Sequence, residues 1–203
     1  MYNFCKIIVR IAMKIAFNLK FEGRENIPKD TPAIFASNHR SNADPPLVAL
    51  GVKTKCSFMA KEELFKNKIF AWLIRSLGAF PVKRGNGDTA VLDTAVERLK
   101  KGENLMIFPE GTRSKDGKVH KGRSGAAVIA ARSMCPIVPV GIVFGEKLKF
   151  RTKITVKYGK LIEASDYFTD SENVDPRALV KMKKRYMAEI TQLVEGDTIE
   201  SER

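Results

Sequence analysis

The sequence predicts a single α/β domain with a mostly parallel central sheet flanked by helices, and an amphipathic helix added at the amino terminus. From Phe21 onward, apolar runs of strand length alternate with stretches of helix length, an order typical of parallel sheets covered by helices. The 203 residues suit one domain with a sizeable core. In the first 20 residues, regularly spaced cations interrupt an apolar run. We therefore divide the chain into residues 1–20 and residues 21–203.

The amino-terminal segment predicts an amphipathic helix. Lys6, Arg10 and Lys14 interrupt its apolar run every four residues, which excludes a membrane span and a signal peptide. On a helix its large apolar side chains share one face, away from these cations; they are Phe4, Ile8, Ile11, Ile15 and Leu19. This stripe either packs on the core of the domain, or lies in a bilayer interface with the cations on anionic head groups. The pattern leaves both interpretations open.

The remaining elements follow in order along the chain. Five apolar runs predict buried strands, at residues 33–37, 55–60, 78–82, 104–108 and 136–143. Four stretches between them predict helices, at residues 45–51, 61–77, 88–102 and 122–134. Asp88 suits the start of the third helix, and Lys100, Lys101 and Gly102 suit its end. Residues 152–159 predict a late, half-exposed strand, and residues 175–196 a terminal helix capped by Asp175.

Polar residues follow four of the predicted strands. His39 follows the first, Lys61 the second, Lys83 and Arg84 the third, and "PEGTRS", residues 109–114, the fourth. The carboxyl ends of parallel strands meet at one edge of a sheet. There, a base, a carboxylate and several cations suit a substrate that carries a phosphate and a hydroxyl to be deprotonated. Taken singly, the cations are also explained as solvated surface residues, and Glu110 with Arg113 as a local ion pair.

The stretch "FASNHRSNADPP", residues 35–46, places Asp44 five positions after His39. In one interpretation Asp44 caps a helix that begins at Pro45, and His39 is an ordinary loop residue. In the other, His39 is a general base whose tautomer is fixed by Asp44. The second histidine, His120, lies in a basic loop far from any cysteine pair, and no spacing typical of a metal site is present.

The charge balance favours an anionic partner. There are 36 Lys and Arg against 23 Asp and Glu, a formal charge of +13, which suits phosphate, a membrane surface or nucleic acid. Modules that bind nucleic acid usually interleave aromatic residues with their cations, and here the tyrosines and Trp72 are not clustered with arginines. We therefore expect no nucleic-acid partner. The three cysteines are widely spaced in apolar contexts, which predicts reduced thiols in a cytosolic setting.

One competing motif is "GNGDTA", residues 85–90, which matches the G-x-G-x-x-A pattern of dinucleotide-binding turns. Lys83 and Arg84 separate it from the preceding strand, whereas a dinucleotide-binding strand runs directly into the first glycine. The other interpretation of this stretch is a flexible turn in which Asp88 caps the next helix.

Four stretches together resemble the sequence blocks of the glycerophospholipid acyltransferases, and most of all the bacterial 1-acylglycerol-3-phosphate acyltransferases: "NHRSNADP", "GAFPVKR", "FPEGTRS" and "PIVPVGI", within residues 20–165. The resemblance implies transfer of a fatty acyl group from an acyl carrier protein or coenzyme A thioester to the sn-2 hydroxyl of lysophosphatidic acid, giving phosphatidic acid. It implies no cofactor and no metal. The alternatives are glycerol 3-phosphate or another lyso-lipid as acceptor, or a non-catalytic protein that binds anionic lipid.

The resemblance also implies roles for individual residues. His39 and Asp44 correspond to the catalytic pair, and the residues that correspond to substrate-binding positions are Lys61, Arg84, Glu110, Gly111, Thr112 and Arg113. It implies a peripheral protein on the cytoplasmic face of the cell membrane, with residues 1–20 as a membrane-interface helix on an anionic surface and residues 21–203 as the acyltransferase domain. Members often carry a longer or two-helix hydrophobic anchor, and this sequence departs from that pattern.

Overall fold

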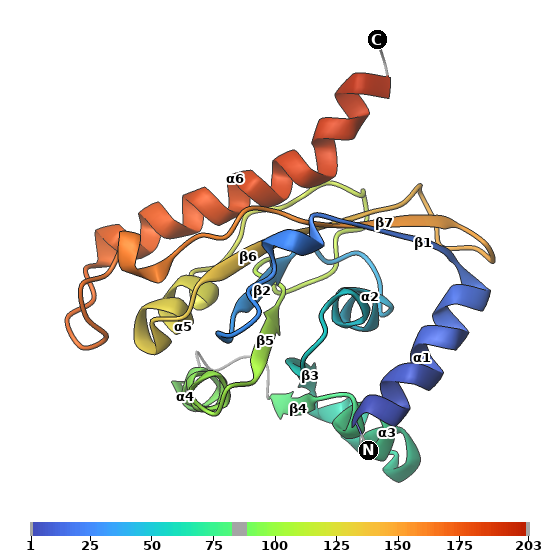
Figure 1. Ribbon diagram of the computed structural model, residues 1–203, viewed down its shortest axis with the longest axis horizontal. Coiled ribbons are helices and arrows are strands. Elements are labelled where there is room, and N and C mark those ends of the chain that lie inside the picture. The colour runs from blue at the N-terminus through green and yellow to red at the C-terminus, as the bar shows by residue number, and fades with distance from the viewer. Residues whose placement is uncertain (1, 83–88, 202–203) are drawn as a thin grey trace.

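A seven-stranded sheet forms the centre of the molecule in a computed structural model that describes residues 2–82 and 89–201 (Figure 1). The strand order is β1-β7-β6-β2-β5-β3-β4. The strands are β1 (Asn18–Glu22), β2 (Ile34–Ser37), β3 (Cys56–Lys61), β4 (Ala79–Val82), β5 (Asn104–Ile107), β6 (Ile137–Val143) and β7 (Lys153–Tyr158). The neighbours from β6 to β4 all pair in parallel, and only β7 pairs antiparallel, with β6. The predicted α/β class and mostly parallel sheet are confirmed.

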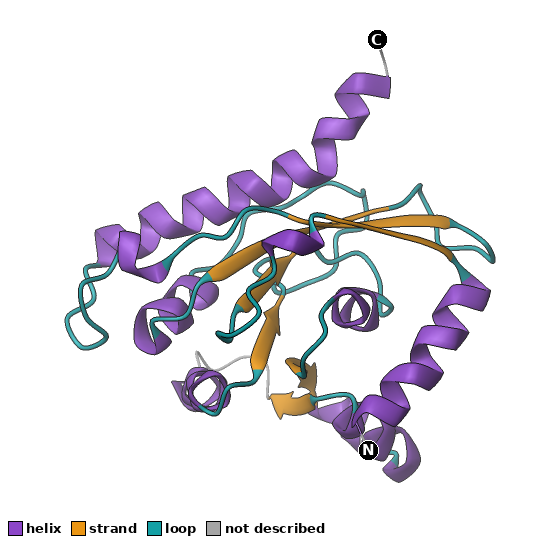
Figure 2. Ribbon diagram, viewed as in Figure 1, coloured by secondary structure: helices purple, strands orange, loops and turns teal. Residues whose placement is uncertain are grey.

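Helices cover both faces of this sheet (Figure 2). The α-helices are α1 (Tyr2–Ala16), α2 (Asp44–Gly51), α3 (Lys68–Ser76), α4 (Thr89–Lys100), α5 (Gly125–Ser133) and α6 (Pro176–Ser201), and the short 3-10 helices are η1 (Arg24–Asn26), η2 (Glu62–Phe65) and η3 (Ala164–Asp166). Side chains alternate along a strand. Accordingly, Ile34 and Ala36 of β2 join the core under α4, α5 and α6, whereas Phe35 joins the core under α2.

Local signals account for several element ends. Gly102, with a φ of 79°, is in the left-handed conformation that ends α4. At the start of α6, Asp175 Oδ1 accepts the Arg177 N–H at 2.8 Å. The single helix predicted for residues 61–77 is divided into the end of β3, η2 and α3. The division occurs because Asn67 Oδ1 accepts the Phe70 N–H at 3.0 Å and starts α3 afresh. Strand β7 is more buried than predicted because it lies between β1 and β6.

The amino-terminal helix is shorter than its apolar pattern predicts. It ends at Ala16, and Leu19 lies in strand β1, which pairs with β7. The backbone explains the change: Arg151 N–H donates to the Ala16 carbonyl at 2.6 Å, and Asn18 N–H donates to the Thr152 carbonyl at 3.0 Å. From Asn18 onward the chain therefore pairs with β7 as a strand, although its apolar periodicity would allow the helix to continue.

Two cations of α1 turn towards the domain. Lys6 Nζ donates to the carbonyls of Val52 and Lys53, and Arg10 Nη2 donates to the Leu50 carbonyl at 3.1 Å. From η1, Arg24 Nε donates to the Gly51 carbonyl at 3.1 Å. The last carbonyls of a helix lack partners within it and carry partial negative charge. Three cations therefore anchor α1 and η1 on the carboxyl-terminal end of α2, and burial lowers the pKa of Lys6, with Arg10 adding to the effect.

The apolar stripe of α1 faces away from the domain. Four of its five predicted side chains, Phe4, Ile8, Ile11 and Ile15, are each more than half exposed, as is the neighbouring Ile7. Leu19, the fifth, packs against the core from β1. The interpretation that this stripe packs on the core is therefore wrong for the residues of α1. Lys6 and Arg10, which the membrane interpretation placed on anionic head groups, bond to the domain instead, whereas Lys14 is exposed. Among the helices that the structure describes, none is both long enough and apolar enough to cross a membrane.

Candidate active site

The predicted site residues collect at one edge of the sheet. Strands β2, β5, β3 and β4 are neighbours and run parallel, so the residues that follow them lie at the same edge. His39 follows β2, Lys61 is the last residue of β3, and Glu110 follows β5. Arg84, Asp88 and most of the "GNGDTA" stretch lie outside the described residues.

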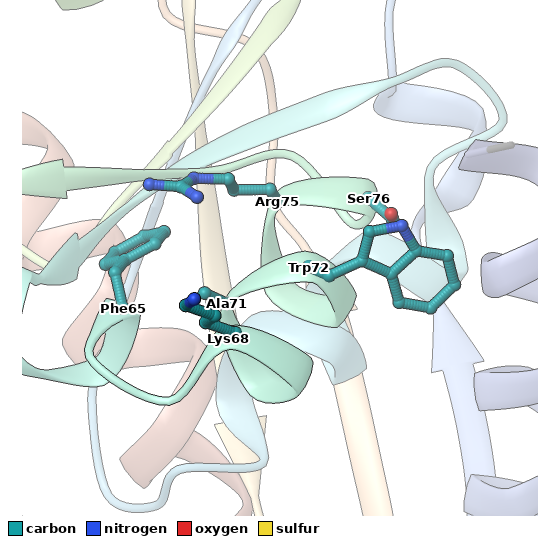
Figure 3. A pocket seen from close by; sticks show the side chains of 6 residues that line it. All are labelled: Phe65, Lys68, Ala71, Trp72, Arg75 and Ser76. Atoms are coloured by element: carbon teal, nitrogen blue, oxygen red, sulfur yellow. The ribbon is translucent and has the colours of Figure 1, made fainter.

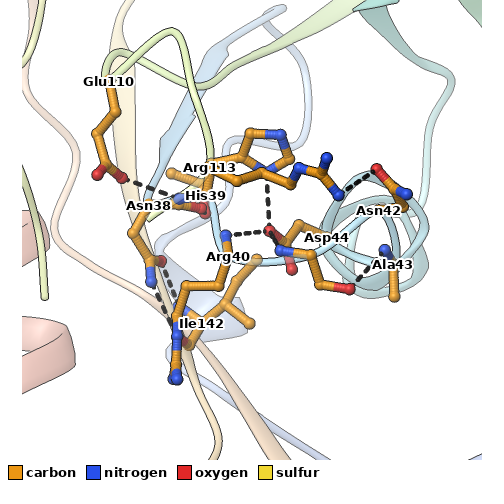
Figure 4. A network of polar contacts seen from close by, with 11 residues as sticks. Asn38, His39, Arg40, Asn42, Ala43, Asp44, Glu110, Arg113 and Ile142 are labelled. Carbon is orange, nitrogen blue, oxygen red and sulfur yellow. Dashed lines mark hydrogen bonds and ion pairs between the residues drawn. The ribbon is translucent and has the colours of Figure 1, made fainter. Parts of the chain in front are cut away.

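His39 and Asp44 form a hydrogen-bonded pair, with His39 Nδ1 2.8 Å from Asp44 Oδ2 (Figure 4). Asp44 is fully buried, and the His39 side chain is 14% exposed. The same Oδ2 atom accepts the N–H groups of Arg40 at 2.6 Å and Ser41 at 2.7 Å. Helix α2 does begin at Asp44, but the carboxylate bonds back to the loop, and its Oδ1 has no partner among the described residues. The helix-cap interpretation is therefore wrong.

The His39 ring is held by packing as well as by Asp44. It stacks on Phe108 with ring centroids 4.1 Å apart and ring planes at 21°. Because Nδ1 faces a carboxylate, it carries the proton in the neutral ring, and Nε2 is left with a free lone pair. The geometry therefore presents one basic nitrogen in a fixed orientation, with a buried carboxylate behind it to stabilise the imidazolium.

The backbone of His39 is fixed by the loop that follows β5. Its N–H donates to Glu110 Oε1 at 2.9 Å, and its carbonyl accepts the Ser114 N–H at 2.7 Å. Glu110 is buried, and its Oε2 accepts the His120 N–H at 3.0 Å. The local ion pair considered for Glu110 and Arg113 is not formed, because this carboxylate serves two backbone N–H groups. Glu110 thus joins the loop after β5 to the loop after β2.

Two residues that support the His39 loop were not predicted. The Asn38 side chain exchanges two hydrogen bonds with the backbone of Ile142, at 2.7 and 3.0 Å. The Arg40 guanidinium donates to the carbonyls of Phe144 at 2.6 Å and Gly145 at 3.0 Å, and lies 4.0 Å above the Phe144 ring. Burial lowers the pKa of Arg40. Both residues tie the loop to the end of β6, and the one sequence signal for them is that they flank His39.

The loop after β5 brings Arg113 to the same place. Gly111, with a φ of 73°, closes a turn in which its N–H donates to the Phe108 carbonyl at 3.0 Å. Thr112 and Arg113 follow it and are exposed, and Arg113 Nη1 donates to Asn42 Oδ1 at 3.1 Å. Lys61 is also exposed at this edge. The structure thus brings His39 and Asp44 together with Glu110 and Arg113. The Arg113 side chain is exposed to solvent beside this pair.

The second histidine also has an aspartate partner, but in a different setting. His120 Nε2 lies 2.9 Å from Asp116 Oδ1, and both side chains are about half exposed. Hydrogen bonds from the Ser114 hydroxyl, the Lys118 N–H and His120 lower the pKa of Asp116 to about 2. This pair is solvated, whereas the His39 pair is buried and fixed, which makes His120 a natural control for His39.

Known sequences are similar to this chain over its site-bearing part. The chain is 37% identical over 142 residues to "1-acyl-sn-glycerol-3-phosphate acyltransferase LPAT1, chloroplastic" of Arabidopsis thaliana, an alignment that covers 68% of this chain but 39% of the plant protein. It is 30% identical over 171 residues to "1-acyl-sn-glycerol-3-phosphate acyltransferase" of Bacillus subtilis, which covers 82% of this chain and 85% of the bacterial protein.

A solved structure shares the fold. It is the crystal structure of the 1-acyl-sn-glycerophosphate (LPA) acyltransferase PlsC from Thermotoga maritima, with a TM-score of 0.78 and 28% sequence identity, covering 97% of this chain and 79% of the PlsC chain. The sequence model of one family, described as Acyltransferase, matches residues 18–143, from β1 to the end of β6. This range contains the whole His39 loop and the Glu110 turn, and the chain therefore belongs to the Acyltransferase family.

Proposed function

We propose that this protein transfers a fatty acyl group from an acyl carrier protein or coenzyme A thioester to the sn-2 hydroxyl of lysophosphatidic acid, giving phosphatidic acid. The observation that carries the proposal is the hydrogen bond of 2.8 Å between His39 Nδ1 and the buried Asp44 carboxylate, at the edge where parallel strands end. The names of the relatives from Arabidopsis and Bacillus support the acceptor.

In this mechanism His39 acts as the general base. A neutral alcohol is a poor nucleophile towards a thioester, so Nε2 takes the hydroxyl proton as the oxygen attacks the carbonyl carbon, a contribution of about 10²–10⁴-fold. Asp44 holds the tautomer and stabilises the imidazolium. When the tetrahedral intermediate collapses, the C–S bond breaks and the proton passes from His39 to the departing thiolate. The acyl group moves directly from sulfur to oxygen.

The negative charge on the tetrahedral intermediate needs a donor. The N–H groups of His39, Arg40 and Ser41 already donate to Glu110 and Asp44. The Gly111 N–H donates to the Phe108 carbonyl. Among the residues predicted for substrate binding, Lys61 has an exposed ammonium group at this edge. We assign this stabilisation to Lys61.

Arg113, together with Arg84, is assigned to the acceptor's phosphate. One N–H of the Arg113 guanidinium donates to Asn42, and an arginine has five such donors, so most remain for a phosphate. The contact with Asn42 also aims the guanidinium at the His39 loop (Figure 4). Holding the phosphate there would place a hydroxyl of the same small molecule near Nε2, which raises its effective concentration.

The Arg113→Ala variant is expected to raise the KM for lysophosphatidic acid about tenfold or more and to leave the KM for the acyl donor unchanged, because a charge-assisted contact to the phosphate is lost. Steady-state kinetics with each substrate varied in turn measures both values. Arg132→Ala is the matched control, since Arg132 pairs with Asp93 on the face of α4 and α5. Equal changes in the two KM values would contradict the assignment.

A panel of acceptors and donors tests the reaction itself. We expect the purified protein to acylate lysophosphatidic acid faster than glycerol 3-phosphate or a lyso-lipid without the phosphomonoester, with carrier-protein and coenzyme A thioesters compared as donors. Faster acylation of another acceptor would replace lysophosphatidic acid in the proposal. Binding of anionic lipid without turnover of any donor would support the non-catalytic alternative.

We also propose that the protein works as a peripheral protein on the cytoplasmic face of the cell membrane, with the stripe of α1 in the bilayer interface. The exposed stripe is the support, together with the fixed attachment of α1 to α2, which would transmit the contact to the domain. The acceptor and the product of the proposed reaction are both bilayer lipids, so docking would bring the sheet edge to its substrate.

The double variant Ile8→Gln, Ile11→Gln is expected to lose co-sedimentation with anionic vesicles while its unfolding temperature stays unchanged, because both side chains are exposed and leave no cavity. Val180→Gln, on the exposed side of α6, is the control and should still co-sediment. Substitution is sharper here than removal of residues 1–19, which would also delete the start of β1. Unchanged vesicle binding by the double variant would move the membrane contact away from α1.

A further inference from the structure

Helix α3 exposes more apolar surface than its packing requires. Its inner side is already used, because Ala71 and Ile74 are buried, the latter in a cluster with residues of β3 and β4. Its outer side nevertheless carries Ile69, which is 82% exposed, Trp72, which is 53% exposed, and Phe70, which is 44% exposed. Large apolar side chains gathered on nine helical residues mark a contact surface rather than ordinary surface scatter.

This surface adjoins the stripe of α1. The two helices are in contact and lie on the same flank of the molecule (Figure 1). In Figure 3 the Arg75 side chain reaches towards Phe65, while Trp72 projects from the opposite side of α3, in the direction of α1 in this view. We call the combined surface the α1–α3 face; it consists of Phe4, Ile7, Ile8, Ile11, Ile15, Ile69, Phe70 and Trp72.

The charged residues around the α1–α3 face favour an anionic partner. Neither α1 nor α3 contains an Asp or Glu, and Lys66, Lys68 and Arg75 are exposed beside the apolar residues of α3. A groove of about 400 Å³ is lined by Lys68, Trp72 and Arg75, among others, and the Arg75 guanidinium lies 5.0 Å from the centre of the Phe65 ring. An apolar helix surface with a tryptophan and a basic border matches the interface of an anionic bilayer.

We propose that α3 is a second membrane-binding element, which inserts Ile69, Phe70 and Trp72 into the interface of an anionic bilayer beside α1. The inference rests on the membrane docking proposed above for α1 and goes beyond it in one respect. A domain attached by one helix can roll about that helix axis, whereas contact through two helices fixes its orientation. Since η2 and α3 follow Lys61 directly in the chain, the second contact is connected to the sheet edge that carries the site.

The sole tryptophan of the chain makes the test direct, because all tryptophan emission reports on α3. On addition of phosphatidylglycerol–phosphatidylcholine vesicles, we expect the Trp72 emission to shift to shorter wavelength and to be quenched by lipids brominated in the acyl chain. In a control carrying Trp72→Phe and Val180→Trp, the reporter moves to α6, and this protein should bind the vesicles without being quenched. Co-sedimentation with Trp72 emission unshifted and unquenched would overturn the proposal.

A substitution on α3 tests how much this helix contributes to the affinity for vesicles. Ile69→Asp is expected to lower vesicle affinity about tenfold or more without changing the unfolding temperature, since the side chain is exposed in the free protein. A lipid-free dimer that shields Trp72 would assign the face to a second copy of the chain and overturn the proposal. Acyl transfer to a detergent-dispersed acceptor is measured separately: quenching without transfer would count against the proposed reaction alone, and transfer without quenching against the α3 contact alone.

Discussion

Replacing His39 with alanine is expected to lower the rate of acyl transfer by about 10²–10⁴-fold, the usual contribution of a general base, while the protein stays folded. The fold should tolerate the change because the bonds that hold this loop involve the backbone of His39, through Glu110 and Ser114. The ring itself contacts Asp44 and Phe108. Turnover under saturating substrate and the thermal unfolding midpoint are the two measurements.

The control for this experiment is His120→Ala. That side chain is about half exposed, and the N–H that donates to Glu110 belongs to the backbone and survives the substitution. Turnover close to that of the unmodified protein is expected. A His39→Ala protein with full activity, or an equal loss in both variants, would rule out His39 as the base.

Asp44 is expected to show two separable effects. In Asp44→Ala the Nδ1–H of His39 and the backbone N–H groups of Arg40 and Ser41 lose their acceptor in a buried place. Each unpaired buried donor costs about 1–3 kcal/mol, so several kcal/mol of unfolding free energy should be lost, with activity. In Asp44→Asn one oxygen still accepts the backbone N–H groups, but no negative charge faces the imidazolium. We expect a nearly intact fold and turnover lower by roughly 10²–10⁴-fold.

Urea unfolding and turnover, measured on the same preparations, separate these effects. A residue that only capped α2 would give a different pattern: a loss of about 1 kcal/mol in Asp44→Ala, and near-normal activity in Asp44→Asn and Asp44→Ser, which still cap. Near-normal turnover in Asp44→Asn would therefore contradict the assigned partnership with His39.

The edge of the sheet at which the site lies was predictable because polar residues mark the ends of the strands in the sequence. Polar residues follow four of the five predicted buried runs, directly or after one proline, and parallel pairing carries those residues to one edge, as for His39 and Glu110. For the direction of the Asp44 carboxylate, the residues alone left two interpretations open, and only the family resemblance favoured the one that faces His39. An aspartate before two prolines also suits a helix start. The hydrogen bonds from the loop to its carboxylate depend on backbone dihedral angles, which cannot be read from the sequence pattern.

The supporting residues were missed because their partners are remote in sequence. Asn38 bonds to Ile142 and Arg40 to Phe144, each 104 positions away, and to backbone atoms that any residue type supplies. The same limit applies to α1. Periodicity separated its apolar face from its basic face, but the carbonyls at the end of α2 decided which face turned inward. Similarly, β7 decided that Leu19 became part of a strand.

Because α1 is attached to the carboxyl-terminal end of α2, the length of α2 sets the distance between α1 and Asp44. At one end the Leu50 carbonyl accepts from Arg10, and the carbonyls of Val52 and Lys53, just past the helix, accept from Lys6, whereas the other end begins with Asp44. Eight residues at 1.5 Å each give a rod about 12 Å long. Inserting a single residue would push Asp44 about 1.5 Å along the axis and turn it by about 100° relative to α1. The number of residues in α2 therefore sets the distance between the proposed catalytic pair and the helix proposed to rest on lipid.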